Sequence, residues 1–424
     1  MARGAGIPCH WEAGVRDPSL AAAPAFSQRI RQTNEIAVLR ALRALGPLSR
    51  AELARVLRMN RSSSGHIVAG LLASGLVRER MAADAPEPAR VGRPGIRLEL
   101  VPEAVFFLGI EIGVEHVTVV VIDLEAAVVT HHVDPFDGPG LSASEALERA
   151  VDLGLRILGP ERRGRCEGVG VSLPAQMEPD GFVRVAPLLG WSGVDVPARL
   201  RAVLPAGLPV LVENDGNAFA IGATYGHAEP RPGVTLFVVL ETGVGAGIAI
   251  DGTLLRGAHG LAGEIGHLLV PDGQGGLRAL EAIIGLEGLL AAYAAETGAG
   301  PQPVLADFLQ RVRDREPAAV TVAEHWSRTL ALALVQVCRV IDPAHVVLGG
   351  SLAPLYPLVS ARVTAHLRET QEASFPVPVI VTDDSEWGSA FGAACLLHQR
   401  FLSPEGHGPA DRAAATAVGP DTLE

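Results

Sequence analysis

The sequence contains no lysine, so all 35 of its basic side chains are arginines. Cysteine is scarce and dispersed: Cys9, Cys166, Cys338 and Cys395 form no CxxC pair. This spacing argues against a disulfide framework, and we expect free thiols in a reducing cytosol. No apolar run reaches the roughly 20 residues that a membrane helix needs, and the first residues lack the apolar core of a secretory signal. We therefore expect a cytoplasmic protein with no membrane partner.

The length of 424 residues allows two or three domains with sizeable cores. Both ends are rich in Ala, Gly and Pro, so we expect disordered tails at residues 1–26 and 403–424. Between them, helical spacing of apolar residues gives way to strand-rich segments beyond residue 104. The sequence therefore predicts a small N-terminal domain, residues 27–100, followed by a larger α/β body.

The net charge of −12 hides a strong asymmetry between these two parts. Residues 27–100 contain thirteen arginines and six acidic residues, whereas the remainder of the chain is acidic. A small basic module on a large acidic body is typical of a DNA-binding domain joined to another function.

Residues 27–100 also follow a helix-turn-helix pattern. After a first amphipathic helix, Ser49 with Glu52 three residues later matches a capping box for a second helix. Asn60 can cap a third helix, and residues 76–101 then read as a β-hairpin wing. Together these elements predict a winged helix-turn-helix domain.

The start of the third helix carries the side chains that helix-turn-helix proteins place in the major groove. Arginine can read guanine there, and serine can bind a phosphate oxygen. In the wing, "VGRPG" holds an arginine in an extended segment that can enter a minor groove. The alternative is a protein-interaction domain with a solvated arginine face. The candidate DNA contacts are Arg61, Ser62, Ser63, His66 and Arg93.

Beyond the N-terminal domain, two series of strands and helices follow one another. The first, residues 105–230, begins with a meander of two or three strands and ends with a strand running into a helix at "PVLVENDGNAFAIGATYG". The second, residues 231–402, begins at "VTLFVVLETGVGAGIAIDGTLLRG" and ends with a helix at "SAFGAACLLHQRF". Two such series predict two α/β lobes around a cleft. Further helices are expected around residues 278–295, 303–313 and 320–341.

The segment "LETGVGAGIAIDG", residues 240–252, has the composition of a phosphate-binding loop. Its small residues would let backbone N–H groups surround an anion. The segment begins with Glu241, however, and a nucleotide would bring further negative charge to that position. The composition of this loop therefore favours phosphate binding, whereas the charge of Glu241 opposes it.

Four motifs occur in the order "VENDGNAFAIGATYG", "ETGVGAGI", "GLAGEIGHLLV" and "VVLGGSLA". Together they resemble the ROK family (repressors, open reading frames and sugar kinases), and the resemblance covers nearly all of residues 27–402. The appended helix-turn-helix and its Gly-Arg-Pro wing are similar to the repressor branch. The resemblance implies a multidomain chain: a winged helix-turn-helix (α+β), then a two-lobed α/β body of the actin-like (ribonuclease H-like) fold. A terminal helix of the second lobe can return to the first.

The resemblance also implies a sugar site. A kinase of this family needs a carboxylate to accept the proton of the sugar hydroxyl, and Asp215 stands at that position. Asn214, Glu264, His267 and Glu281 match family positions that hydrogen-bond sugar hydroxyls, which both donate and accept. Taken singly, Asn214 and Asp215 could merely cap the following helix, and His267 could be a core histidine.

Both phosphate loops depart from the family pattern. Family kinases carry Asp-x-Gly-Gly-Thr-Lys at the first loop, where residues 111–116 read "EIGVEH"; at the second, Glu241 replaces a glycine. At an effective dielectric near 20, a like charge about 4 Å from a phosphate is unfavourable by roughly 4 kcal/mol. We therefore expect no ATP. The degenerate loop positions are Glu111, Gly113, Glu241, Gly243 and Gly245.

Two further departures concern metal and sugar contacts. Many ROK proteins hold a structural zinc through C-x-C-G-x-x-G-C, but Asp272, Gln274 and Ala279 stand at the three cysteine positions. One imidazole with Asp and Gln makes a poor zinc site, so we expect no metal and a loop presenting His267 by packing alone. In "APLLGW", Pro187 stands where sugar kinases often place an Asn, which removes one sugar contact.

We therefore interpret the chain as a sugar-responsive transcriptional regulator that represses carbohydrate-utilisation genes, with a catalytically inactive kinase body as its sensor. The expected partners are double-stranded operator DNA, a small sugar or sugar-phosphate inducer, and further copies in a homodimer or homotetramer. Two alternatives remain. One is an ATP-dependent ROK sugar kinase that carries a DNA-binding domain, and the other is a ligand-free interaction scaffold.

Overall fold

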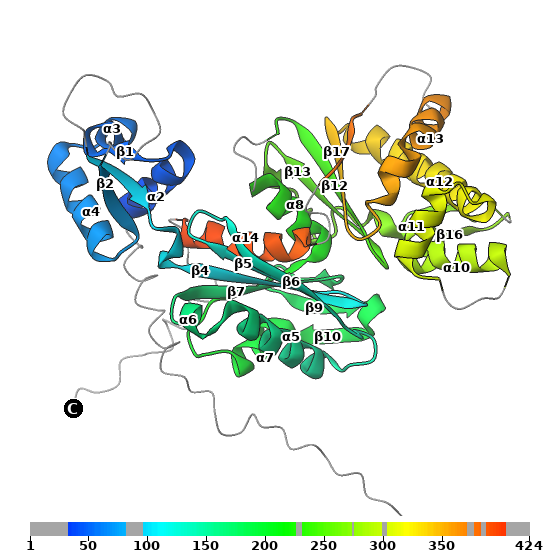
Figure 1. Ribbon diagram of the computed structural model, residues 1–424, viewed down its shortest axis with the longest axis horizontal. Helices are drawn as coiled ribbons and strands as arrows, with labels where there is room; N and C mark the ends of the chain where they lie inside the picture. The colour runs from blue at the N-terminus through cyan, green and yellow to red at the C-terminus, as the bar shows by residue number, and fades with distance from the viewer. Residues whose placement is uncertain are drawn as a thin grey trace, which may run out of the picture.

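The computed structural model describes residues 33–81, 96–225, 231–273, 275–298, 303–370, 377–382 and 387–403. It consists of a small head, residues 33–100, and a body of two α/β lobes, residues 105–403 (Figure 1). The predicted multidomain architecture is therefore confirmed. No helix in the described ranges combines the length and apolarity needed to cross a membrane.

The described residues of the head form three helices and one small antiparallel sheet. The predicted capping box is present: Ser49 Oγ accepts the Glu52 N–H at 3.2 Å, and Glu52 Oε2 accepts the Ser49 N–H at 2.8 Å. The wing strands pair as predicted, and a short strand that the sequence did not predict adds a third member, in the order β1-β3-β2. The elements are α2 (Thr33–Leu45), β1 (Leu48–Ser49), α3 (Arg50–Val56), α4 (Arg61–Ala73), β2 (Val77–Met81) and β3 (Ile96–Leu100).

The tip of the wing, with the predicted minor-groove residue Arg93, lies outside the described residues. The core of the head is continuous with the body. Leu39, Leu53 and Val68 of the head belong to the same buried cluster as Phe107 and Leu397 of the body. The head is therefore packed against the first lobe rather than tethered to it.

The first lobe is built on a five-stranded sheet in the order β11-β7-β4-β5-β6. The expected meander is β4 (Phe106–Ile112), β5 (His116–Asp123) and β6 (Val128–Pro135), while β7 (Cys166–Leu173) and β11 (Val210–Asn214) add in parallel. Helices α5 (Ala143–Leu158), α6 (Pro160–Arg163) and α7 (Val196–Val203) cover one face (Figure 1). A second sheet holds β8 (Gln176–Met177), β9 (Phe182–Ala186) and β10 (Trp191–Asp195).

The second lobe repeats this plan with the sheet order β14-β13-β12-β17-β18. Its strands are β12 (Val234–Leu240), β13 (Val244–Ile250), β14 (Thr253–Leu254), β17 (His345–Gly349) and β18 (Val379–Val381), with a separate hairpin of β15 (Leu269–Pro271) and β16 (Leu277–Ala279). Helices α9 (Glu281–Ile284), α10 (Leu286–Thr297), α11 (Leu305–Arg313), α12 (Pro317–Ile341) and α13 (Leu355–Thr370) pack beside them. Helix α13 was not predicted, and Gly285 divides the stretch expected as one helix into α9 and α10.

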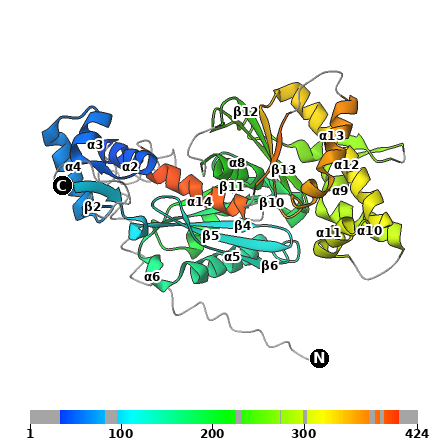
Figure 2. The ribbon, with the colours of Figure 1, turned by 45° about the horizontal axis from the view of Figure 1, so that its top comes forward.

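Two helices occupy the space between the lobes, α8 (Asp215–Tyr225) and α14 (Gly388–Phe401) (Figures 1 and 2). The terminal helix α14 packs on α8 and on strands β4 and β7, so it lies against the first lobe. The packing of α8 requires glycine. A Cβ on Gly216 would lie 2.6 Å from the backbone nitrogen of Ala246 in β13, and one on Gly222 would lie 3.0 Å from the carbonyl oxygen of Gly388 in α14.

Candidate functional site

The predicted body residues meet in one cavity between the lobes, which is open to solvent. Strand ends of both lobes supply them: β4 and β11 from the first lobe, β12 and β13 from the second. A short 3₁₀ helix, η5 (Ile265–His267), and the start of α9 complete the wall. All ten lie along the lining, namely Glu111, Gly113, Asn214, Asp215, Glu241, Gly243, Gly245, Glu264, His267 and Glu281.

Asn214 and Asp215 lie where β11 passes into α8. Asn214 Oδ1 accepts the N–H of Asn217 at 3.1 Å, and its Nδ2 donates to the carbonyl of Ala175 at 3.2 Å. The capping interpretation therefore holds for Asn214, but one N–H and one lone pair of its amide remain for a ligand. Asp215 is 9% exposed and accepts the N–H of Gly216 at 2.8 Å.

Burial raises the pKa of Asp215 to about 6, and the nearby carboxylates of Glu241 and Glu264 add to the effect. Gly245 allows strand β13 to approach this carboxylate, because a Cβ there would lie 3.1 Å from Asp215 Oδ1. The result is a carboxylate that accepts hydrogen bonds at neutral pH and that faces an open cavity.

A buried glutamate that the sequence analysis missed, Glu213, accepts hydrogen bonds from the residues around Asn214. Glu213 Oε1 accepts the N–H of Asn214 and the Nδ2–H of Asn217, both at 3.1 Å. Its other oxygen forms an ion pair with the Arg256 guanidinium, which comes from the second lobe. The ion pair joins the two lobes directly beside the cavity. The sequence did offer a signal for this residue, because Glu213 directly precedes Asn214 and Asp215 in the motif "VENDGNAFAIGATYG".

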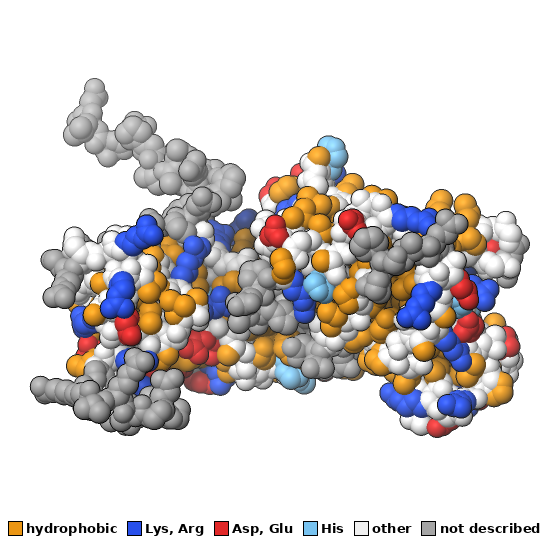
Figure 3. Space-filling view, turned by 90° about the horizontal axis from the view of Figure 1, so that it is seen from above, with side chains coloured by type: hydrophobic (Ala, Val, Ile, Leu, Met, Phe, Trp, Pro, Cys, Tyr) orange, Lys and Arg blue, Asp and Glu red, His pale blue; other side chains and the backbone are white. Residues whose placement is uncertain are grey.

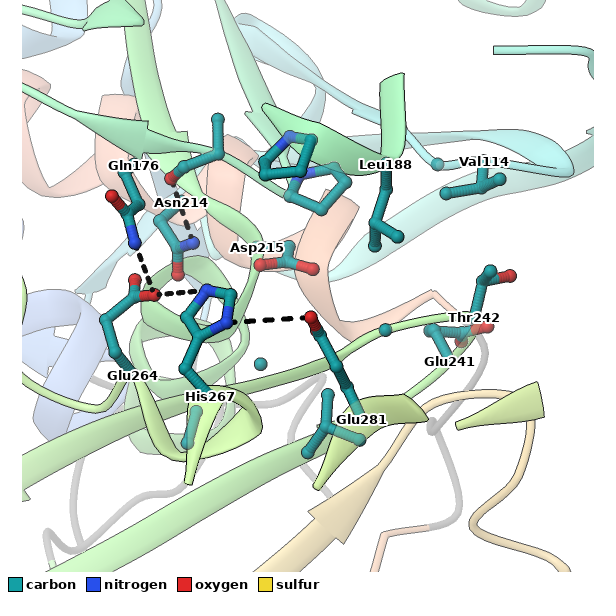
Figure 4. A pocket seen from close by; sticks show the side chains of 18 of the residues that line it. Val114, Gln176, Leu188, Asn214, Asp215, Glu241, Thr242, Glu264, His267 and Glu281 are labelled. Carbon is teal, nitrogen blue, oxygen red and sulfur yellow. Dashed lines mark hydrogen bonds and ion pairs between the residues drawn. The ribbon is translucent and has the colours of Figure 1, made fainter. Parts of the chain in front are cut away.

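His267 lies between two carboxylates (Figure 4). Its Nε2 is 3.4 Å from Glu264 Oε2, and its Nδ1 is 3.6 Å from Glu281 Oε1. The side chain is 46% exposed, so the core-histidine interpretation is wrong. Gln176, from the first lobe, donates through Nε2 to Glu264 Oε2 at 3.2 Å. The sequence analysis did not identify Gln176. Its bond to Glu264 is a second contact between the two lobes, in addition to the Glu213–Arg256 ion pair.

The opposite side of the cavity is apolar. Val114 and Leu188 point toward the space beside Asp215 (Figure 4). Pro187, which stands where sugar kinases often place an Asn, lines the cavity too, but Leu188 is the labelled side chain that projects inward. A ligand therefore meets hydrocarbon from Val114 and Leu188 as well as hydrogen-bonding groups.

The two degenerate phosphate loops place their acids close to Asp215. Glu111 is 5% exposed, and burial raises its pKa well above the usual range, with the charges of Glu241 and Asp215 adding to the effect. Glu241 is held in place from across the second lobe. Its Oε1 accepts the N–H of Ser351 at 2.6 Å, and its Oε2 accepts the Ser351 hydroxyl at 2.5 Å.

The hairpin at the position of the family zinc loop is closed by hydrogen bonds. Asp272 Oδ1 accepts the N–H of Gly276 at 2.9 Å, and β15 pairs with β16 so that Ala279 lies opposite Leu269. The expectation that packing alone would hold this loop is therefore wrong. Gln274 lies outside the described residues. Among the residues that are described, no three His, Cys, Asp or Glu side chains gather in a group able to bind a metal.

The head presents a candidate DNA surface around α4. Arg61, Ser62 and Ser63 form the first turn of α4, and His66 is exposed one turn later; the side chains of the first three are outside the described set. Arg55, at the end of α3, and Arg58, in the turn that follows, are also exposed. Figure 3 shows arginine side chains over the head, at the left of the view.

Several arginines of the head are already paired with acids. Arg50 lies 2.8 Å from Glu79, and Arg78 and Arg80 lie 2.7 Å and 3.3 Å from Glu99. These pairs belong to the sheet and its flank. The cationic side chains near the start of α4 therefore contribute more than these paired arginines to the positive electrostatic potential that a DNA backbone would meet.

Comparison with known proteins places this geometry in context. Residues 107–400 match the model of the ROK family. The xylose repressor of Bacillus spizizenii is 22% identical over 384 residues, which is 88% of this chain and 97% of the repressor. The crystal structure of a ROK family transcriptional regulator, a homologue of the E. coli MLC protein, has a TM-score of 0.67 at 21% identity and covers 89% of this chain and 99% of that one.

A ROK family glucokinase from Streptomyces griseus, solved with glucose and AMPPNP, has a TM-score of 0.62 at 23% identity. It covers 69% of this chain and 99% of the glucokinase. The two regulators therefore match more of the chain than the body alone, whereas the glucokinase match is about the size of the body.

Proposed function

The chain belongs to the ROK family, as its four sequence motifs predict, and we propose that it is a sugar-responsive, DNA-binding transcriptional regulator. One observation carries the proposal: a winged helix-turn-helix head shares a hydrophobic cluster with the body whose cavity gathers hydroxyl-binding side chains. The similarity to a xylose repressor supports a role as a cytoplasmic repressor of carbohydrate-utilisation genes.

In this proposal the head binds double-stranded operator DNA. The start of α4 enters the major groove, where Arg61 reads a base and Ser62 or Ser63 contacts a phosphate. Arg55 and Arg58, exposed next to this helix, contact the phosphate backbone. A homodimer or homotetramer presents two heads to a pseudo-palindromic operator.

The body serves as the sugar sensor. Asp215, Glu264 and Glu281 accept hydrogen bonds from sugar hydroxyls, and Asn214 and His267 supply donors. The side chains come from both lobes, so a bound sugar stabilises one relative arrangement of the lobes more than another. Such a difference in affinity is what shifts the population between two states of the regulator.

The competing function is that of a sugar kinase with an added DNA-binding domain. A buried Asp215 with a pKa of about 6 favours it, because a general base works best near the operating pH. The bonds between Glu241 and Ser351 argue against it, since they place a carboxylate in the second phosphate loop. A coupled ADP-release assay with magnesium and a broad sugar panel separates the two. We expect background rates, whereas turnover of about 1–100 s⁻¹ would establish the kinase.

The proposed function itself is tested by operator binding with and without sugar. Fragments selected from a genomic library supply the operator, and a thermal-shift panel supplies the sugar. Fluorescence anisotropy should then show tight binding that the sugar weakens. Binding of DNA that no stabilising sugar alters would leave a DNA-binding protein without a sensor, and the proposal would be wrong.

A further inference from the structure

The cavity described above is lined by acids without a matching number of cations. Its lining includes five carboxyl side chains, and the basic groups among the described lining residues are two histidines, His116 and His267. No arginine is among them, and the chain has no lysine. The carboxyl groups are those of Glu111, Asp215, Glu241, Glu264 and Glu281.

One pair of donors beside the cavity that could bind an anion is already used. A backbone N–H beside a serine hydroxyl is the pair of donors that commonly binds a phosphate oxygen. At Ser351 both of these donors bind the carboxylate of Glu241, at 2.6 Å and 2.5 Å. The chain thus supplies its own anion at this position, and that anion borders the cavity.

Two further acids, Glu111 and Asp215, face the same space from the first lobe. Glu111 is buried, and its pKa is raised well above the usual range by that burial and by the nearby Glu241 and Asp215. The raised pKa of Glu111 reflects how poorly these surroundings solvate negative charge. A phosphate placed there would meet Asp215 and Glu241 with no arginine or lysine on the described wall to compensate.

We propose that this cavity selects an uncharged sugar and rejects phosphorylated sugars and sugar acids. The proposal rests on the sugar-sensing function above and narrows its ligand to one chemical class. Such selectivity depends on electrostatic repulsion of the wrong ligand as much as on favourable contacts to the right one. Neutral hydroxyls, by contrast, match the acceptors on Glu264, Glu281 and Asp215.

The experiment compares neutral sugars with their anionic derivatives. Isothermal titration with the full chain uses D-glucose, D-glucuronate and D-glucose 6-phosphate, and the corresponding members of the galactose and N-acetylglucosamine series. For the series that binds, the neutral sugar should bind at least about tenfold more tightly than its anionic partners. An anionic partner that binds as tightly or more tightly would overturn the inference while leaving sugar sensing intact.

A variant tests the physical cause. Glu241→Gln keeps groups able to bind Ser351 but removes one negative charge, so the preference for the neutral sugar should shrink several-fold. Glu148→Gln, on the exposed face of α5, is the matched control and should leave the preference unchanged. An undiminished preference in a folded Glu241→Gln protein would show that its charge is not the cause. If no sugar of any charge binds the wild type, the proposed sensor function fails instead.

Discussion

The guanidinium carbon of Arg43, in the head, lies 4.0 Å from the centre of the Tyr225 ring, in the body. Tyr225 is the last residue of α8, and the first, Asp215, lines the cavity. The Tyr225 hydroxyl donates to His398 Nδ1 at 2.6 Å, and His398 Nε2 donates to the carbonyl of Leu124 at 2.7 Å. One helix therefore connects the cavity to the contact between head and body.

Because of this connection, we expect Arg43→Ala to weaken the coupling between sugar and operator while preserving each binding event. Cation–π contacts contribute about 0.5–2 kcal/mol, so the change in operator affinity caused by sugar should shrink by a factor of about 2 to 30. Anisotropy titrations with and without the best sugar measure this factor. Arg149→Ala, at an exposed position of α5, is the control. A full sugar response in Arg43→Ala would exclude this contact from the coupling.

Asp215→Ala and Glu264→Ala should give proteins that bind the operator and no longer respond to the sugar. A charge-assisted hydrogen bond contributes roughly 1.5–3 kcal/mol, so losing one should lower sugar affinity ten- to hundredfold. Operator affinity should persist because both residues lie in the body. Isothermal titration measures the sugar and anisotropy the DNA, with Glu148→Ala as control. Variants that answer the sugar as the wild type does would mean that the cavity is not the sensor.

Arg61→Ala should weaken operator binding by roughly 1–3 kcal/mol and relax the sequence preference at one base pair. Arg93→Ala should act mainly on sites with an A·T-rich minor groove. Gel-shift titrations on the operator and on single-base variants measure both effects, with Arg149→Ala as control. If neither substitution alters the titration, the recognition surface lies elsewhere.

His398 should make stability fall in acid. Burial lowers its pKa from 6.5 to about 4, so between these values the unfolded chain binds a proton that the folded chain does not. The contribution of His398 to the free energy of unfolding is fully present above pH 6.5. It is lost as pH falls toward 4, by about 3 kcal/mol in all. Urea unfolding at several pH values measures it.

The comparison for this prediction is His398→Gln. Asp215, whose pKa is raised to about 6, acts with the opposite sign in part of the same window, so the difference between wild type and variant isolates the histidine. The difference in free energy of unfolding should narrow as pH falls. Parallel curves would show that the pKa of His398 is the same in the folded and the unfolded chain, which would contradict the prediction.

The altered zinc loop predicts a protein without bound zinc. Elemental analysis of the purified chain should give far less than one equivalent, because Asp272 and Ala279 replace two of the family's cysteines. Gentle removal of metal by a chelator should leave the thermal midpoint unchanged. A stoichiometric zinc signal would contradict the argument from the missing thiolates.

The sequence and its resemblance to the ROK family were sufficient to predict ten residues that line the cavity, although Gln176 was missed. Asn214, Glu241 and Glu264 each belong to a short motif at a strand end or turn, and such ends meet at the edge of a sheet. The capping box at Ser49 and the pairing of the wing strands were predictable for the same reason, since both depend on neighbours in the sequence.

Contacts between distant segments could not be predicted in this way. Glu241 and Ser351 are 110 residues apart, and Arg43 and Tyr225 are 182 apart. No local pattern links either pair, because each depends on how complete elements pack. Helix α13 escaped prediction for a related reason: its sequence, "LYPLVSARVTAHLRET", has a proline near its start and β-branched residues within it, and packing against α12 offsets this weak propensity.

Helix α8 also fixes the angle about its axis at which Asp215, at its first residue, and Tyr225, at its last, point. Glycines bring it to backbone distance from β13 on one side and from α14 on the other, which leaves no room for it to turn about its axis. Each residue of an α-helix advances the chain by about 100° and 1.5 Å. Inserting or deleting one residue within Asp215–Tyr225 would thus rotate the Tyr225 ring away from Arg43, even with every side chain retained. The alignment of cavity and head is encoded in the number of residues between them.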